Sequence, residues 1–284
     1  MSPLTSEEIT DAVLQLPSLP NIVIELINAL DNSDVDTNTL AQKISHDQAL
    51  TAKVLGLANS SFYGMQSKVG SIPHAVAVLG FNSVRSLVTA AAVVETFSAG
   101  KSQGLDYAEF WKHSIATALA AKAIAKCLGL NQDSAFIAGL LHNIGRLVLA
   151  TYSPMRYQEV LSWRSVHDGD LIAAEVHILG IDHKTAGRAV LQHWKFPSSI
   201  VDTLNAASET NPHEHHRAAS LVAVADAIAY GLDLSGGEHD RVPGISQMEW
   251  DLLGLQETAL MEIFEATEMQ FEEACMILVA TAKV

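Results

Sequence analysis

Residues 140–145 read Leu-Leu-His-Asn-Ile-Gly and indicate more about the fold and chemistry of this chain than any other stretch. Their apolar side chains predict a hydrophobic helix that brings His142 next to Gly145. A His-Asp pair in this setting would supply half of a metal site, because imidazole nitrogens and carboxylate oxygens are common metal ligands. Here Asn143 stands in the second position. The stretch therefore predicts the frame of a metallohydrolase in which one ligand is replaced.

Helical periodicity continues outward from this stretch in both directions. Apolar residues recur at helical spacing over residues 19–30, and Asp36 or Thr37 and then Asp47 can cap the helices that follow. A long Ala-rich helix is expected from Tyr107 to Cys127. No segment alternates apolar and polar residues as a half-buried strand would. The sequence predicts an all-α fold.

Two polar, glycine-containing stretches divide the chain. Residues 98–104 read SAGKSQG, and residues 231–244 contain four glycines and one proline. We therefore expect an N-terminal helical lobe over residues 1–100, a helical bundle over 105–230 and a C-terminal helical extension over 231–284. The cleft between the lobe and the bundle is the default pocket, because domain junctions often form binding sites.

The composition restricts the partners of the protein. Among 284 residues, 49% are hydrophobic and the net charge is −15, which fits a chain with a sizeable core. This negative charge repels phosphate backbones and anionic lipids, so neither nucleic acid nor a membrane surface is an expected partner. No signal peptide and no apolar run of about 18 residues is visible, so no membrane span is predicted. A cytoplasmic protein is expected.

The two cysteines, Cys127 and Cys275, are expected to be small core residues. They lie far apart on predicted helices, and neither belongs to a CxxC redox or zinc element. This pattern suits a reducing compartment.

Histidines and an aspartate on several predicted helices form the candidate site. His113, His142, His183 and Asp226 are spaced so that separate helices of a bundle could bring them to one cation. A bound divalent ion would lower the pKa of a water and allow it to attack a phosphoester. Side chains 142 and 143 point about 100° apart on a helix, so only a metal close to the backbone could bind both.

Seven blocks of sequence follow one another between residues 10 and 230. They are LPSLP (16–20), ISHDQALTAKVL (44–55), ANSSFYG (58–64), IPHAVAVLG (72–80), FWKHS (110–114), AFIAGLLHNIG (135–145) and HWKFP (193–197). In this set and order the chain resembles the HDOD family, output domains related to the HD superfamily of metal-dependent phosphohydrolases. The resemblance implies an N-terminal helical lobe followed by an HD-like helical bundle.

The resemblance also assigns the positions of a degenerate metal site. Carried over residue by residue, the HD metal positions fall on His113, His142, Asn143, His183 and Asp226. A His-His pair typical of the family should lie near Ala207 and Ser208, and it is absent. An asparagine offers a hard cation only a neutral carbonyl oxygen. HDOD domains are regarded as regulatory and largely without phosphohydrolase activity, and these two losses agree with that.

The sequence therefore predicts a non-catalytic bacterial signal-transduction protein, without a cofactor, that acts by binding a protein partner or a small ligand. Its vestigial site would survive as a hydrogen-bonded polar cluster, since a buried Asp226 must be paired. The alternative is a residual metal-dependent phosphohydrolase acting on a nucleotide or cyclic dinucleotide, with metal at His113, His142, His183 and Asp226. A purely structural scaffold is a third possibility.

Other polar groups have structural and functional interpretations. His213, His215 and His216 lie in a polar loop before a helix and are interpreted as a solvated helix start; alternatively, His215 or His216 replaces the missing pair. Asn59 and Ser60 are interpreted as turn-forming residues.

Two arginines on apolar helices are likewise open to two interpretations. Arg85 and Arg146 either pair with an acidic side chain or hold a phosphate.

Overall fold

The computed structural model describes residues 6–28, 37–60, 63–64, 68–98, 105–167, 169–204, 212–236 and 242–279. These residues form helices and no β-strand, which confirms the predicted all-α class. The helices are α1 (Ser6–Leu14), α2 (Asn21–Asn28), α3 (Thr37–His46), α4 (Gln48–Ala58), α5 (Ile72–Leu79), α6 (Phe81–Ser98), α7 (Tyr107–Cys127), α8 (Gln132–Leu141), α9 (Ile144–Tyr152), α10 (Pro154–His167), α11 (Leu171–Leu179), α12 (His183–His193), α13 (Ser198–Val201), the 3₁₀ helix η1 (Asp202–Leu204), α14 (Pro212–Gly231), α15 (Gln247–Leu253) and α16 (Glu257–Leu278).

Side-chain caps fix where several helices begin. Asp47 accepts a hydrogen bond from the Leu50 amide at 2.9 Å and starts α4, as the sequence predicts. Asp182 caps α12 through the amide of Thr185 at 2.7 Å. The long helix α7 has the predicted bounds. These starts are encoded locally, because each cap lies within three residues of its partner.

The turn after α4 is held by the Asn59 side chain. Its Nδ2 donates to the carbonyl oxygens of Leu55 and Val69, and its Oδ1 accepts from the Val69 amide at 2.7 Å. Ser60 donates to the Leu57 carbonyl at 2.6 Å. The structural interpretation of this polar pair is confirmed.

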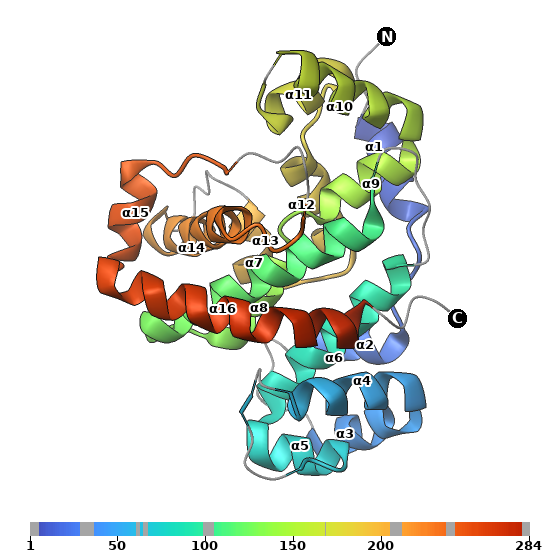
Figure 1. Ribbon diagram of the computed structural model, residues 1–284. Coiled ribbons are helices and arrows are strands. Elements are labelled where there is room, and N and C mark those ends of the chain that lie inside the picture. The colour runs from blue at the N-terminus through green and yellow to red at the C-terminus, as the bar shows by residue number, and fades with distance from the viewer. Residues whose placement is uncertain are drawn as a thin grey trace.

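Figure 1 shows helices α3, α4 and α5 together at the lower end of the molecule, with α10 and α11 at the upper end. Helix α6 packs against α4 and α5 on one side and against α8 on the other, so it joins the N-terminal helices to the central pair α7 and α8. Helix α1 instead packs against α9 and α12. Buried residues of α2 to α6 share one hydrophobic cluster with residues of α7, α8, α12 and α16.

The C-terminal helix α16 crosses the front of the molecule in Figure 1 and packs mainly on α7. Its last turns reach α4, where a Cβ placed on Gly56 would lie 3.3 Å from Cγ2 of Ile277. Phe271 and Leu278 are buried in the same cluster as the N-terminal helices. The C-terminal extension therefore contributes to the common core.

Two expectations need correction. Cys127 is exposed, because it is the last residue of α7, whereas Cys275 is buried as expected. Helix α14 starts at Pro212, so residues 213–216 belong to the helix and not to a preceding loop; proline suits a first helical position, where no backbone donor is needed.

Among the described residues, one helical segment is long and apolar enough to cross a membrane. It is Gln132–Tyr152, which comprises α8 and α9 and has 83% of its most apolar window buried inside the fold. Burial of this kind is typical of a core helix.

Candidate functional site

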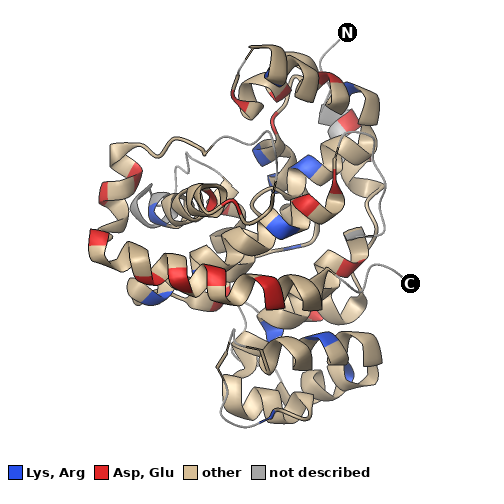
Figure 2. Ribbon diagram, viewed as in Figure 1, with Lys and Arg blue, Asp and Glu red and all other residues tan. Residues whose placement is uncertain are grey.

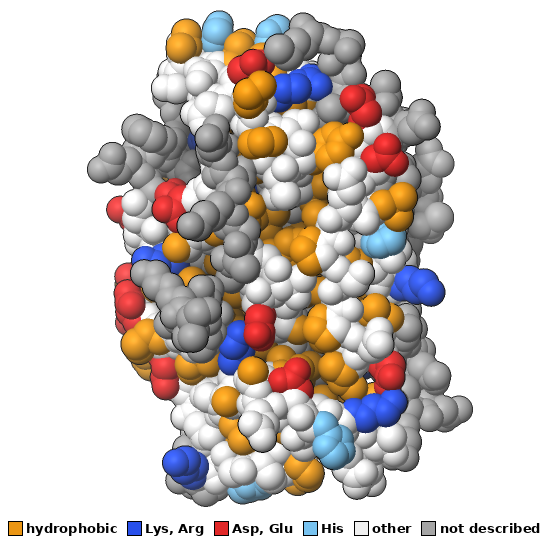
Figure 3. Space-filling view, turned by 90° about the vertical axis from the view of Figure 1, so that its right-hand side faces the viewer, with side chains coloured by type: hydrophobic (Ala, Val, Ile, Leu, Met, Phe, Trp, Pro, Cys, Tyr) orange, Lys and Arg blue, Asp and Glu red, His pale blue; other side chains and the backbone are white. Residues whose placement is uncertain are grey.

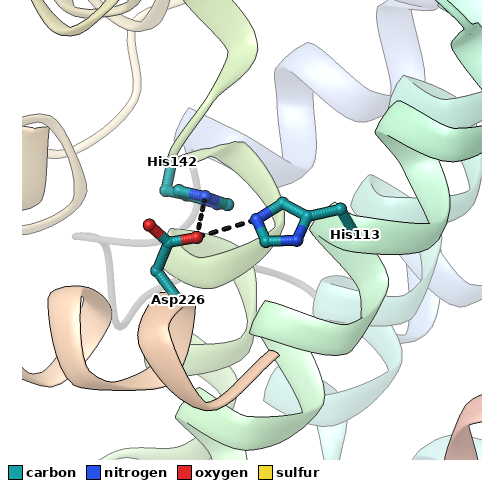
Figure 4. Close-up of side chains that lie close together, drawn as sticks. All are labelled: His113, His142 and Asp226. Atoms are coloured by element: carbon teal, nitrogen blue, oxygen red, sulfur yellow. Dashed lines mark hydrogen bonds and ion pairs between the residues drawn. The ribbon is translucent and has the colours of Figure 1, made fainter. Parts of the chain in front are cut away.

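Three helices bring His113, His142 and Asp226 together (Figure 4). His113 lies on α7 and Asp226 on α14, and Nε2 of His113 lies 2.7 Å from Oδ1 of Asp226. His142 follows directly after α8, and its Nε2 lies 3.1 Å from the same oxygen. One ligand atom from each residue lies within 4.8 Å of the other two. We call these three residues the His–His–Asp cluster.

The cluster is largely shielded from solvent. The side chains of His113 and His142 are 6% and 7% exposed, and that of Asp226 is 20% exposed. The ring of Tyr230 lies 4.0 Å from the His113 ring, centroid to centroid, and covers one face of it. Asp226 is therefore the most exposed of the three side chains.

The hydrogen bonds of His142 fix its tautomer. Nδ1 lies 2.6 Å from the Gly139 carbonyl oxygen, which only accepts, so Nδ1 carries a proton. In neutral His142, Nε2 would then present a lone pair to the Asp226 carboxylate. The contact is favourable only when Nε2 carries a proton or binds a cation. A backbone carbonyl that fixes the other ring nitrogen is also the usual arrangement for a metal-binding histidine.

Electrostatics favour an ionised Asp226. Burial alone would raise the pKa of its carboxyl group, but the two neighbouring imidazoles, His142 foremost, lower this pKa far below its usual range. Burial lowers the pKa of His113, and Asp226 partly offsets this effect. A neutral His113 therefore donates its Nε2 proton to Asp226, while its buried Nδ1 has no hydrogen-bond partner in the described structure.

Two glycines allow the close helix contacts around the cluster. A Cβ on Gly139 of α8 would lie 2.8 Å from Cα of Ala118 on α7, so only glycine permits this approach. A Cβ on Gly145 of α9 would lie 1.9 Å from the backbone oxygen of His183, at the start of α12. The glycine of the opening sequence stretch is thus required for packing of α9 on α12.

His183 does not join the His–His–Asp cluster. Its Nδ1 lies 2.6 Å from Oε2 of Glu175 on α11, and its backbone amide donates to the same oxygen at 2.8 Å. Glu175 is fully buried. His183 thus lies outside the group of three residues whose ligand atoms come within 4.8 Å of one another, and Glu175 holds only its Nδ1. A role for its Nε2 as a further metal ligand stays a prediction.

Asn143 occupies the junction between α8 and α9. It is buried, caps α9 by position only, and forms no side-chain capping hydrogen bond. The amide thus sits directly after His142, where a carboxylate would add negative charge to the cluster.

Two sequence hypotheses fall outside the described parts of the chain. Ala207 and Ser208, where the His-His pair is missing, are not described. The side chains of His213, His215 and His216 are not described either, so their interpretation stays a prediction.

Sequence reasoning missed several partners of these side chains. Glu175 is a lone acid in the apolar stretch LIAAEVHIL, which could have indicated a buried pair. Tyr230 lies one turn after Asp226 on α14.

Nε of Arg146 donates to the hydroxyl of Tyr157 on α10 at 3.1 Å. Burial raises the pKa of Tyr157 to about 12, so it stays a neutral partner.

A cavity of about 740 Å³ lies where the N-terminal helices, the bundle and α16 meet. It is lined by Tyr63 and Ser83 from the N-terminal part, Lys122 and Lys126 from α7, Asp133 from α8 and Glu262 from α16, among others. Nζ of Lys122 lies 4.1 Å from the centre of the Tyr63 ring, a cation–π contact.

A second cavity of about 340 Å³ lies between α1, α6, α7 and α9 and is mostly apolar, with Phe97 and Val148 among its lining residues. Hydrophobic side chains also gather in the middle of the face that lies on the right of Figure 1 (Figure 3).

The fold and the cluster define an all-helical protein of the HD type. A family model described as the HDOD domain matches residues 16–210, so the chain belongs to the HDOD family. The chain is 29% identical over 238 residues to an uncharacterized protein of Treponema pallidum (strain Nichols), covering 79% of this chain and 44% of that relative. It thus spans less than half the length of that protein.

Solved structures show the same fold along nearly the whole chain. A protein of Shewanella amazonensis SB2B, provisionally named a phosphohydrolase, is 30% identical with a TM-score of 0.75, over 95% of this chain and 98% of that one. An HDOD domain protein with unknown function from Geobacter sulfurreducens is 26% identical with a TM-score of 0.74, over 96% of this chain and 98% of that one.

Proposed function

We propose that this HDOD protein is a non-catalytic regulatory component of bacterial signal transduction that binds a protein partner or a small ligand. The observation that carries the proposal is the His–His–Asp cluster itself. Three ligand atoms converge among the described residues, and the residue after His142 is an amide. Three protein ligands can hold a catalytic ion, so the number of ligands does not decide the question. The amide argues against catalysis, because it offers a hard cation only a neutral oxygen.

The cluster has a sufficient structural role without a metal. Asp226 accepts a hydrogen bond from Nε2 of His113, and also one from Nε2 of His142 when His142 is doubly protonated, so it ties α14 to α7 and to the end of α8. A buried ionised carboxylate is tolerated because it is paired. The same residues that would hold a metal therefore hold three helices in register.

The 740 Å³ cavity is the proposed ligand site. Its lining comes from Tyr63 in the turn after α4 and from α6, α7, α8 and α16, so a ligand bound there would contact all these parts at once. A ligand that binds one arrangement of these helices better than another would shift the population between the arrangements. This is the simplest way in which the protein could transmit a signal.

A residual metal-dependent phosphohydrolase is the second candidate, because Gly139 holds His142 in the tautomer of a metal ligand. The similar protein provisionally named a phosphohydrolase agrees with this candidate. His113, His142 and Asp226 would hold the ion, which would supply a hydroxide for attack on a phosphoester of a nucleotide or cyclic dinucleotide.

Elemental analysis separates the two candidates. The full chain, purified without added metal, is compared with a His142→Ala variant and with His74→Ala, a control at an exposed histidine. We expect far less than one metal ion per chain in all three proteins and no hydrolysis of nucleotides or cyclic dinucleotides. Stoichiometric iron, manganese or zinc that disappears only in His142→Ala, together with turnover, would overturn the non-catalytic proposal.

A gain-of-function variant tests the role of the amide. Asn143→Asp restores a carboxylate next to His142, and carboxylate oxygens bind divalent ions more strongly than amide oxygens do. We expect manganese or zinc affinity, measured by calorimetry, to rise by about tenfold or more over the parent. Equal affinities would show that Asn143 does not limit metal binding.

A further inference from the structure

The five methionines that the structure describes are all on the surface. Exposure is 73% for Met155, 63% for Met248, 61% for Met261, 70% for Met269 and 61% for Met276. Methionine usually fills gaps in cores, and exposed clusters of it are typical of surfaces that adapt to a binding partner. Three of these side chains lie on α16, so this helix is the part of the surface where the unusual exposure is concentrated.

The exposed methionines of α16 share one side of the helix with glutamates. At 100° per residue, the six outward residues cover an arc of about 100°. They are Met261, Glu265, Glu268, Met269, Glu272 and Met276, which together we call the acidic methionine face. The opposite side, with Ile263 and Phe271, is buried against the rest of the molecule. The acidic methionine face therefore lies on the solvent side of a helix whose other side is packed against the protein core.

The charge of α16 has a single sign. The helix has six glutamates and no lysine, arginine or histidine. In Figure 2 acidic residues follow one another along it. Within the described structure, Glu265, Glu268 and Glu272 form no ion pair. Like-charge repulsion disfavours a second copy of this face, nucleic acid and anionic lipid as occupants.

We propose that the acidic methionine face binds a basic amphipathic helix of a partner protein. The methionines would contact the apolar side of that helix, since amphipathic helices dock by apolar residues spaced three and four apart. The glutamates would face its lysines and arginines, which gives charge complementarity and faster association. This inference rests on the proposed regulatory function and specifies the class of protein partner. The surface itself is separate from the His–His–Asp cluster.

A designed peptide tests this surface with the full-length protein. The probe is a fluorescent helical peptide of about 20 residues, with leucine on one side and lysine on the other. We expect saturable binding in an anisotropy titration, weaker at higher salt, and no binding of a matched peptide with glutamate in place of lysine. Glu265→Lys with Glu268→Lys should weaken binding of the lysine peptide by about tenfold or more.

Matched variants distinguish binding at the acidic methionine face from non-specific attraction to an acidic protein. Asp11→Lys with Glu159→Lys changes the net charge equally at two exposed residues of α1 and α10, and should leave the affinity nearly unchanged. Gln in place of Met261, Met269 and Met276 should weaken binding about fivefold or more without changing the charge. Circular dichroism checks that each variant is folded.

Three outcomes would overturn the proposal. The control pair could weaken binding as much as the α16 pair, which would mean non-specific attraction. The Met→Gln changes could have no effect. Sedimentation could show a dimer that these changes dissociate, so that a second copy covers the face. A His142→Ala variant should bind the peptide like the parent, so failure here is distinguishable from failure of the proposed regulatory function.

Discussion

Replacing Gly145 by alanine tests the tightest contact next to the candidate site. The added Cβ would lie 1.9 Å from the backbone oxygen of His183, 2.6 Å from the amide nitrogen of Gly187 and 2.8 Å from the carbonyl carbon of His183. All three atoms belong to the backbone of α12, so no side-chain rotation can relieve the clash. Helices α9 and α12 would have to move apart.

The structure gives the expected size of the effect. Added methyl groups in packed cores cost about 1–3 kcal/mol when neighbouring side chains can adjust. Here two helix backbones must shift and His183 must move relative to Glu175, so we expect a loss of about 3 kcal/mol or more in the free energy of unfolding. The measurement is urea denaturation followed by far-UV circular dichroism.

Gly231→Ala is the matched control. Gly231 is the last residue of α14, and a Cβ there meets no atom within 4 Å. Alanine is a better helix former than glycine, so this change should be neutral or stabilise the protein by up to about 1 kcal/mol. If Gly145→Ala destabilised the protein no more than the control did, the close contact between α9 and α12 would be refuted.

Three further predictions concern buried polar and sulfur groups. Glu175→Gln removes the charge opposite His183 and should destabilise the fold by about 1–3 kcal/mol in the same assay; an unchanged urea midpoint would contradict the pairing. Burial lowers the pKa of Lys122 to about 8 from its usual 10.5. Because the unfolded chain keeps this proton between those values, stability relative to Lys122→Met should rise as pH increases above about 8, and parallel urea curves would contradict this. Burial raises the pKa of Cys275 to about 12, so a thiol reagent should label the exposed Cys127 in the folded protein and Cys275 only after unfolding, as mass spectrometry can show.

Much of the fold could be predicted because the signals are local. The bounds of α7 follow from an apolar, Ala-rich run, and Asp47 and Asp182 cap helices through residues only three positions away. The ordered blocks also indicated the family that the family model then showed. The sequence does not predict the start of α14, because Pro212 and the polar residues after it are typical of a loop as well as of a first helical turn.

The candidate site could be predicted only in part. His113, His142 and Asp226 were expected to converge, and they do. His183 was placed with them, but it pairs with Glu175, which the sequence pattern did not associate with it. By residue type alone, each of these histidines could pair with either Glu175 or Asp226. Which pairs form depends on the distances between the side chains in the folded protein.

The sequence by itself determined the helical class, the family and the residue types available for chemistry, including the amide at Asn143, because periodicity, caps and motifs depend on neighbours along the chain. The tertiary structure decided which side chains meet. His113 and Asp226 are 113 positions apart, and only the packing of α7 against α14 brings them to 2.7 Å. The close approach of α9 to α12 at Gly145 is likewise a tertiary contact between separate segments, which no local pattern encodes.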